Sequence, residues 1–165
     1  MQSDFKPVMA ITMGDPAGIG PEIVVGTMLS QEIADCCKPF VIGSAYILQR
    51  AADVLKKDIK INKISDPAEA KYELGTIDIL ETGPYDDASI EWGKVQKLAG
   101  QMAIDWIMKS IELGMAGKVD AVSTSPINKQ AIKLIGVKEP GHTEIYQHAT
   151  HSPYALTMFS CHKLR

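Results

Sequence analysis

Short apolar runs alternate with amphipathic stretches along the first third of the chain. Met9–Met13 and Phe40–Gly43 are compact apolar runs bounded by turn residues, which is typical of short buried strands. Pro21–Leu29 follows the first run and predicts a helix. Ser44–Leu55 follows the second and predicts another, with Ser44 as its N-terminal cap and one apolar face.

Two segments in the middle of the chain alternate with a period of two residues. These are Asp58–Ile64 and Thr76–Glu81, and the Asp66-Pro67 pair separates them. The alternation predicts two half-exposed strands. We expect them to form an edge of the sheet or a small side region.

The clearest helical periodicity covers Lys94–Met115, where apolar residues recur at spacings of three and four. A strand is predicted at Val119–Thr124, and a helix at Asn128–Ile135, which Gly136 ends. One more strand is predicted at Tyr154–Ser160. Alternating strands and helices favour an α/β fold with a mainly parallel sheet.

Length and composition fit one ordinary globular domain. The chain has 165 residues, of which 45% are hydrophobic and 22% charged, and its mean hydropathy is -0.01. The net charge of -3 gives no reason to expect a nucleic acid or an anionic membrane as partner. No apolar run approaches the ~20 residues of a membrane span, and the N-terminus does not have the pattern of a secretion signal.

Cysteine usage indicates a reducing compartment, so we expect a cytoplasmic protein. There are three cysteines, and Cys36 and Cys37 are adjacent, which is a poor geometry for a disulfide between them. We interpret them as structural or incidental thiols. Because the sequence stops directly after a predicted strand, we also expect it to be part of a longer protein.

A glycine- and proline-rich loop follows the first predicted strand. Within Ile11–Val25, Asp15 lies among three glycines and two prolines, and Pro21 suits the first position of the helix that follows. A polar loop between a strand and a helix N-terminus can bind an anion. The alternative is a purely structural tight turn, and the loop matches neither G-x-G-x-x-G nor a Walker A motif.

Two further candidate sites also follow predicted strands or turns. In residues 123–129 hydroxyl groups precede a helix whose first turn carries Lys129, which could hold a phosphate or a carboxylate. The alternative is a helix cap beside a solvated lysine. His142 follows a Pro-Gly turn, so its imidazole could face a cleft, and the alternative is a capping or exposed histidine. His148 and His151 could share a helix face, but two histidines alone are a weak zinc signal, and we expect no metal site within this chain.

Three motifs together resemble one family. MGDPAGIGPEI, TSPINK and GHTE, in this order, closely resemble the PdxA family of 4-hydroxythreonine-4-phosphate dehydrogenases, and the resemblance runs from Ile11 to Arg165. The first motif also resembles the GDGIGPE loop of isopropylmalate and isocitrate dehydrogenases. The resemblance implies a three-layer α/β/α fold of the isocitrate/isopropylmalate dehydrogenase type, of which residues 1–165 would be the N-terminal part.

The resemblance also implies a reaction. A phosphorylated 3-hydroxy acid is oxidised with NAD or NADP and then loses CO2, with help from a divalent Zn, Mg, Co or Mn ion. The substrate would be 4-phosphohydroxy-L-threonine, on the route to pyridoxal phosphate, or 4-phospho-threonate or -erythronate. His142 and Thr143 would contact the substrate, with Lys129 and Asp15 lining the same cleft. No residue is assigned to catalysis or to NAD.

The family's metal ligands, three histidines, and most of its NAD contacts would lie beyond Arg165. The active site would be shared between the subunits of a homodimer, so residues 1–165 alone should be inactive. Other readings remain open: a dihydrodiol carboxylate dehydrogenase of the same family, a phosphate acyltransferase on the same fold, or a non-catalytic fragment.

Overall fold

A five-stranded parallel sheet forms the centre of the computed structural model, which describes residues 5–159. The strand order is β3-β4-β2-β1-β5, and each neighbouring pair is parallel. The strands are β1 (Val8–Thr12), β2 (Lys38–Ile42), β3 (Lys60–Ile64), β4 (Thr76–Leu80) and β5 (Ala121–Thr124).

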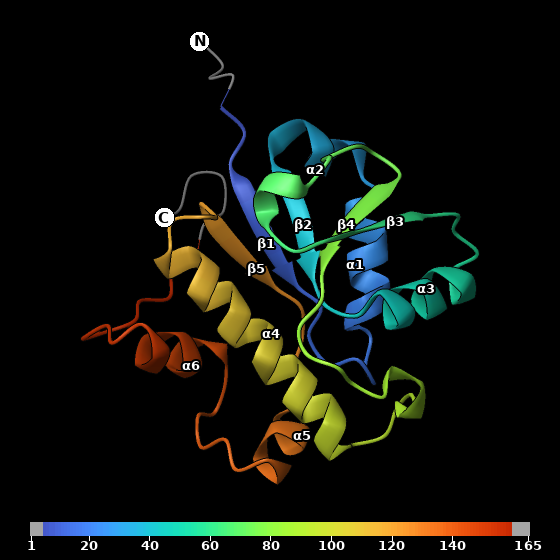
Figure 1. The fold of residues 1–165 in the computed structure, drawn as a ribbon. Coiled ribbons are helices and arrows are strands. Elements are labelled where there is room, and N and C mark those ends of the chain that lie inside the picture. Colours follow the sequence, from blue (N-terminus) through green and yellow to red (C-terminus); the bar gives the residue numbers. More distant parts are fainter. Residues whose placement is uncertain (1–4, 160–165) are drawn as a thin grey trace.

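Six α-helices accompany the sheet within the described residues (Figure 1). They are α1 (Gly20–Met28), α2 (Gln31–Cys36), α3 (Ala45–Val54), α4 (Lys97–Met115), α5 (Lys129–Leu134) and α6 (His142–Ala149). Two short 3-10 turns lie at Pro67–Glu69 and Asp87–Ser89.

The strand order decides which helices cover which face. The connections β1→β2 and β2→β3 run in one direction across the sheet, whereas β3→β4 and β4→β5 run in the other. Right-handed crossovers therefore place α1 and α3 on one face and α4 on the opposite face. The contacts agree, because α1 packs on α3, while α4 packs on β1, β2 and β5 (Figure 1). The expected three layers are confirmed.

The core lies between the sheet and these helices. Parallel sheets are buried on both faces, and the inner strands are accordingly almost entirely apolar. The largest fully buried side chains include Trp106 and Met102 of α4 and Phe40 of β2. Burial of such side chains is the main force that fixes the α4 layer on the sheet.

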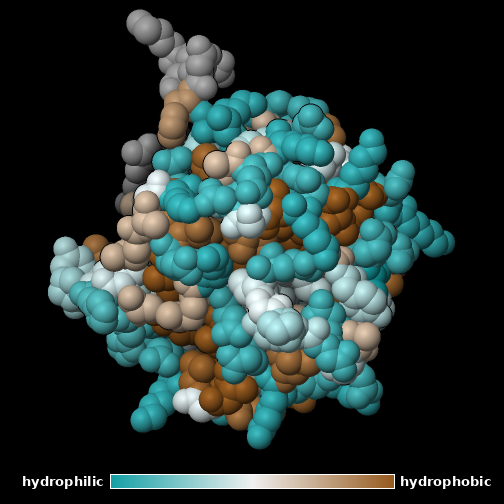
Figure 2. Space-filling view, viewed as in Figure 1, coloured by the Kyte–Doolittle hydropathy of each residue, from teal (hydrophilic) through white to brown (hydrophobic). Residues whose placement is uncertain are grey.

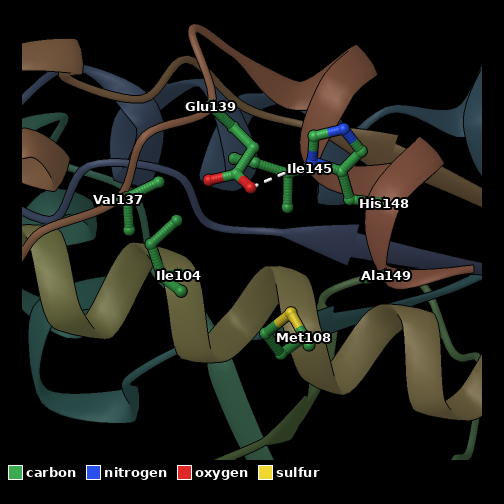
Figure 3. Close-up of a pocket in the computed structure, with 7 residues that line it drawn as sticks. All are labelled: Ile104, Met108, Val137, Glu139, Ile145, His148 and Ala149. Carbon is green, nitrogen blue, oxygen red and sulfur yellow. Dashed lines mark hydrogen bonds and ion pairs between the residues drawn. The ribbon is translucent and has the colours of Figure 1, made fainter.

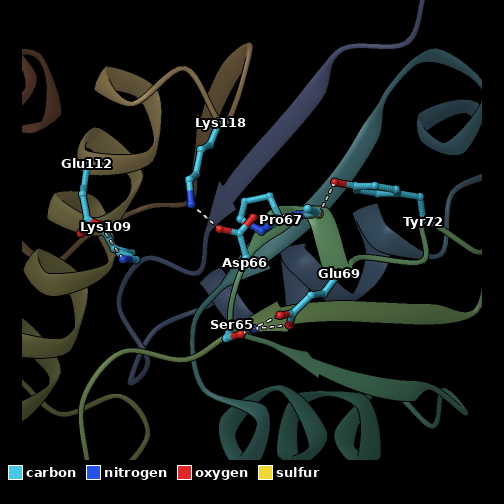
Figure 4. A network of polar contacts seen from close by, with 9 residues as sticks. Ser65, Asp66, Pro67, Glu69, Tyr72, Lys109, Glu112 and Lys118 are labelled. Atoms are coloured by element: carbon cyan, nitrogen blue, oxygen red, sulfur yellow. Dashed lines mark hydrogen bonds and ion pairs between the residues drawn. The ribbon is translucent and has the colours of Figure 1, made fainter.

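A polar network holds the β3–β4 connection against the end of α4 (Figure 4). Asp66, which follows β3, forms an ion pair with Lys118, which follows α4. Glu69 accepts hydrogen bonds from the Ser65 backbone N–H at 2.9 Å and from its hydroxyl at 2.8 Å. The hydrogen bond from Lys118 is the main cause of a lowered pKa at Asp66.

Asp78 is a fully buried carboxylate in β4 that organises the same connection. One of its oxygens accepts from Asn62 Nδ2 at 2.6 Å, and the other accepts from the Tyr72 backbone N–H at 2.8 Å. Asp78→Ala would leave both partly buried donors without this partner, so we expect the free energy of unfolding to fall by about 2–4 kcal/mol. Urea denaturation measures this. Asp58→Ala, at an exposed position, is the control and should change stability by less than about 0.5 kcal/mol; an equal effect of the two variants would contradict the role of Asp78.

Most expected elements are present with ends shifted by one to three residues, and Ser44 caps α3 by accepting from the Ile47 N–H. Three expectations were wrong. The strand at Thr76–Leu80 is not peripheral, because β4 lies between β2 and β3 and is mostly buried. Tyr154–Phe159 forms no strand, and the last residue of that predicted strand, Ser160, is outside the described residues. His151 lies beyond the end of α6, so it does not share a helix face with His148. None of the helices in the described part of the chain could cross a membrane.

Candidate functional site

The carboxyl ends of β1 and β5 lie side by side, because these two strands are direct neighbours in the sheet. After β1 the chain turns into α1 on one face, and after β5 it turns into α5, which packs on α4 at the other face. Two neighbouring strands whose connections leave to opposite faces form a crevice, and open α/β sheets bind ligands there. The loops at residues 13–19 and 125–128 are the two walls of this crevice.

The two loops are locked together through their backbones. The Asp15 N–H donates to the Pro126 carbonyl at 2.9 Å, and the Ser125 N–H donates to the Thr12 carbonyl at 3.1 Å. Gly14 has a φ of +78°, and a Cβ added there would lie 2.4 Å from the Pro126 oxygen. Glycine is therefore required both for the turn and for the close approach of the second loop.

Asp15 is buried beneath the crevice. Its Oδ1 accepts from the Ala17 N–H at 2.9 Å. Burial raises the pKa of Asp15, while the hydrogen bond from Ala17 and the nearby Asn128 side chain act in the opposite direction. The carboxylate thus lies near both loops.

The Asn128 side chain caps α5 and also lies near the first loop. Its Oδ1 caps α5 by accepting from the Gln130 N–H at 2.9 Å and the Ala131 N–H at 3.1 Å. Its side chain also lies near the Asp15 carboxylate, whose pKa it lowers, and both residues line the same cavity. Lys129, the first residue of α5, is placed by this arrangement.

A cavity of about 440 Å³ opens between the two loops. Asp15 and Lys129, which the sequence predicts to share a cleft, both line it. Lys129 also extends toward α6, since its Cε lies 4.0 Å from the position that a Cβ of Gly141 would occupy. The complete lining is Asp15, Gly18, Ile19, Pro126, Ile127, Asn128 and Lys129.

His142 and Thr143 begin α6, directly after Gly141. Neither lines the 440 Å³ cavity, and Lys129 is the link between that cavity and the start of α6. His142 is half-buried, and its Nε2 is enclosed without a hydrogen-bond partner. Burial lowers the pKa of His142, so its imidazole is neutral at neutral pH. Thr143 is exposed. The substrate contacts expected of Asp15, Lys129, His142 and Thr143 stay predictions.

Comparison with known families shows to which family the chain belongs. Residues 35–165 match the family model described as pyridoxal phosphate biosynthetic protein PdxA. The chain belongs to the PdxA family. The family match begins after the glycine-rich loop, but the curated relatives align over nearly the whole chain, including that loop.

Among those relatives is a protein of Symbiobacterium thermophilum, provisionally named D-threonate 4-phosphate dehydrogenase. It is 43% identical over 162 residues, which are 98% of this chain and 48% of the relative. A relative from Fusobacterium nucleatum with the same provisional name is 43% identical over 161 residues, covering 98% of this chain and 48% of the relative. This PdxA chain therefore spans about half the length of the curated relatives that it matches.

Solved structures show the same fold. The crystal structure of a 4-hydroxythreonine-4-phosphate dehydrogenase from Burkholderia phymatum superimposes with a TM-score of 0.86 at 41% identity, over 90% of this chain and 44% of that one. The enzyme of that name from Klebsiella pneumoniae gives a TM-score of 0.83 at 35% identity, over 88% of this chain and 45% of that one. The α/β fold expected from the three motifs is thus confirmed.

The sequence did not identify two features of this PdxA site. Asn128 was predicted only as the first residue of a helix, and nothing in the sequence indicated that it lies near Asp15. A contact behind the first loop was also missed: the Gly93 N–H donates to the Ala17 carbonyl at 2.8 Å, and the neighbouring Trp92 ring has the Arg50 guanidinium 4.3 Å from its centre. The only signal in the sequence was a tryptophan beside a glycine.

A different hollow, of about 310 Å³, lies between α4 and α6 (Figure 3). Its lining is mainly apolar, with Ile104 and Met108 of α4 facing Ile145 of α6. At its rim His148 Nδ1 and Glu139 Oε1 are 3.0 Å apart. Figure 2 shows hydrophobic surface over the region where α4, α5 and α6 lie in Figure 1. This lining does not suit a phosphorylated acid, so we place the candidate site in the β1–β5 crevice instead.

The divalent metal implied by the family does not fit the residues described here. Between residues 5 and 159, no three His, Cys, Asp or Glu side chains come close enough to hold a metal ion. We therefore derive no step through a metal from this part of the PdxA chain.

Proposed function

We propose that the protein is an NAD-dependent dehydrogenase of a 4-phosphorylated 3-hydroxy acid, and that the β1–β5 crevice and the start of α6 form one wall of its substrate site. The observation that carries this proposal is the joining of Asp15, Asn128 and Lys129 at the crevice. A buried carboxylate lies beside an amide that caps a helix, and the first residue of that helix is an exposed cation. This arrangement suits an anionic ligand that must be held in one orientation.

The names of the relatives support a substrate class for this proposal. D-threonate 4-phosphate, named for the sequence relatives, is our first candidate. 4-Hydroxythreonine 4-phosphate, named for the solved structures, is the second. Both are four-carbon acids with a phosphate at one end, a carboxylate at the other and a hydroxyl at C3. They differ at C2, which carries a hydroxyl in the first and an amine in the second.

The reaction follows from this substrate chemistry. Oxidation at C3 removes a hydride, which NAD would accept, and the proton of the hydroxyl group. The product is a β-keto acid, whose carboxylate leaves as CO2 while the electron pair passes to the ketone. A divalent metal, when bound, would stabilise negative charge on that oxygen. We assign no residue of this chain to the hydride, the base or the metal.

The chain's own residues bind and orient the substrate in this proposal. Lys129 pairs with the phosphate or the carboxylate, and Thr143 offers a hydroxyl donor at the start of α6. His142, held neutral by burial, hydrogen-bonds to the substrate without adding charge. Asp15 lines the cavity beside Asn128. We further propose a cytoplasmic homodimer whose subunits share the active site.

Lys129→Met tests the role of the cation. A charge-assisted hydrogen bond contributes about 1.5–3 kcal/mol, so we expect KM for 4-phospho-D-threonate to rise about 10- to 100-fold. Steady-state kinetics of the complete gene product that contains this sequence measures this. Lys133→Met, at an exposed position of the same helix, is the matched control and should leave KM within about twofold. If both variants have the KM of the wild type, Lys129 does not bind the substrate.

The function itself is tested with the same complete gene product. NADH formation in the presence of a divalent metal is measured with 4-phospho-D-threonate, 4-phospho-D-erythronate, 4-phosphohydroxy-L-threonine and a cis-dihydrodiol carboxylate. We expect turnover of at least one phosphorylated acid, with threonate preferred, and loss of turnover with a chelator. Absence of NADH with every phosphorylated acid would refute the proposal, and turnover of the dihydrodiol alone would move the protein to the other branch of the family.

A further inference from the structure

Two adjacent cysteines meet where α2 ends and β2 begins. Cys36 is the last residue of α2, and Cys37 is extended, with φ -149° and ψ 175°. This change of backbone conformation between neighbours directs both thiols at one carbonyl. Cys36 Sγ lies 3.5 Å and Cys37 Sγ 3.4 Å from the Ile33 oxygen.

Three hydrogen-bond donors compete for the Ile33 carbonyl oxygen. It also accepts from the Cys37 backbone N–H at 3.0 Å, so three donors share an oxygen with two lone pairs. Thiols are weak donors and lose this competition to the backbone N–H. Both sulfurs thus lie beside the same carbonyl oxygen and are only weakly bound to it, which preorganises them for a group that binds both.

The pair is open on one side. Cys36 is exposed, whereas Cys37 is buried. Burial is the main cause of a raised pKa at Cys37, the neighbouring Cys36 raises it further, and the charge of nearby Lys6 acts in the opposite direction. Cys37 therefore enters a reaction mainly as a thiol, and a suitable reagent must take up its proton as it binds.

We propose that Cys36 and Cys37 form a binding site for trivalent arsenicals. An organic arsenic(III) oxide, R–As=O, condenses with both thiols to give R–As(S)2 and one water. Two As–S bonds form, the As=O bond breaks, and its oxygen leaves with the two thiol protons; nothing is oxidised or reduced. Adjacent residues are poorly placed for a direct S–S bond, and an arsenic atom between the sulfurs avoids that constraint.

The site is separate from the candidate substrate site. Cys37 precedes the amino end of β2, which begins at Lys38, whereas the β1–β5 crevice opens at the carboxyl ends of the strands. The inference is independent of the proposed dehydrogenase activity. It is tested by binding alone.

The probe is phenylarsine oxide, added to the 165-residue chain in which Cys161→Ser leaves only the adjacent pair. We expect one phenylarsenic group per chain by intact mass and loss of both free thiols. A dithiol should release the group, and a monothiol at equal concentration should not. Cys36→Ala and Cys37→Ala, each in the Cys161→Ser background, should each weaken binding about 100-fold or more, because the second bond is intramolecular in the parent. Circular dichroism checks that the variants are folded.

Three outcomes would overturn the inference. One is binding by a folded single-cysteine variant within about threefold of the parent. Another is a thiol that remains titratable at saturation. The third is loss of both thiols in air before the arsenical is added, which would make the pair an oxidation site.

Discussion

Gly14→Ala is expected to lower the free energy of unfolding by about 4 kcal/mol. Two costs combine at this position. A non-glycine residue at a φ of +78° is strained by about 1–3 kcal/mol, and a Cβ 2.4 Å from the Pro126 oxygen forces the β5 loop to move, at about 1–3 kcal/mol more. Chemical denaturation of the chain measures the sum.

Gly75→Ala separates these two costs. Gly75 has a φ of +85°, but nothing lies within 4 Å of an added Cβ. Gly75→Ala should therefore lower the free energy of unfolding by the backbone strain alone, about 1–3 kcal/mol. Equal losses at the two glycines would mean that the contact of Gly14 with the second loop contributes nothing, and the two loops would not be interlocked as described.

His142→Ala is expected to reduce kcat/KM of the complete gene product at least about 100-fold, which is the loss typical of a donor that stabilises a transition state. The neutral, half-buried ring has an enclosed Nε2 without a partner, and an unused buried polar group indicates a role beyond folding. Steady-state kinetics with 4-phospho-D-threonate measures the effect.

His148→Ala is the matched control on the same helix. His148 is exposed and pairs with Glu139 at the surface, an interaction that contributes little. It should leave kcat/KM within about twofold. If His142→Ala also stays within twofold, His142 is not part of the site.

Local patterns predicted most of the fold, because periodicity reflects burial. The alternation of strands and helices was sufficient for the α/β class, and the apolar face of α4 was evident from spacing alone. Which strands pair in the sheet is not a local property, however. Nothing in TIDILE indicates that β4 pairs on both sides, and the apolar residues of Tyr154–Phe159 resemble a strand although they form none. The helix α2 was missed because six residues carry too little periodicity.

For the candidate site too, local patterns were visible in the sequence and contacts between distant residues were not. Asp15 and Lys129 could be selected because glycines, prolines and helix starts mark special backbone positions. Their closeness depends on β1 and β5 being neighbours, a relation between residues more than 100 positions apart that neither motif contains. That Asp15 and Asn128 lie near each other follows from that pairing, so it becomes visible only in three dimensions.

A crystal structure of the complete gene product with bound 4-phospho-D-threonate tests the central claim most directly. We predict that the substrate lies between the loops after β1 and β5 and the start of α6. Lys129 Nζ should be within hydrogen-bond distance of its phosphate or carboxylate, and His142 and Thr143 should contact its other polar groups. A substrate bound elsewhere, such as in the hollow between α4 and α6, would contradict the account.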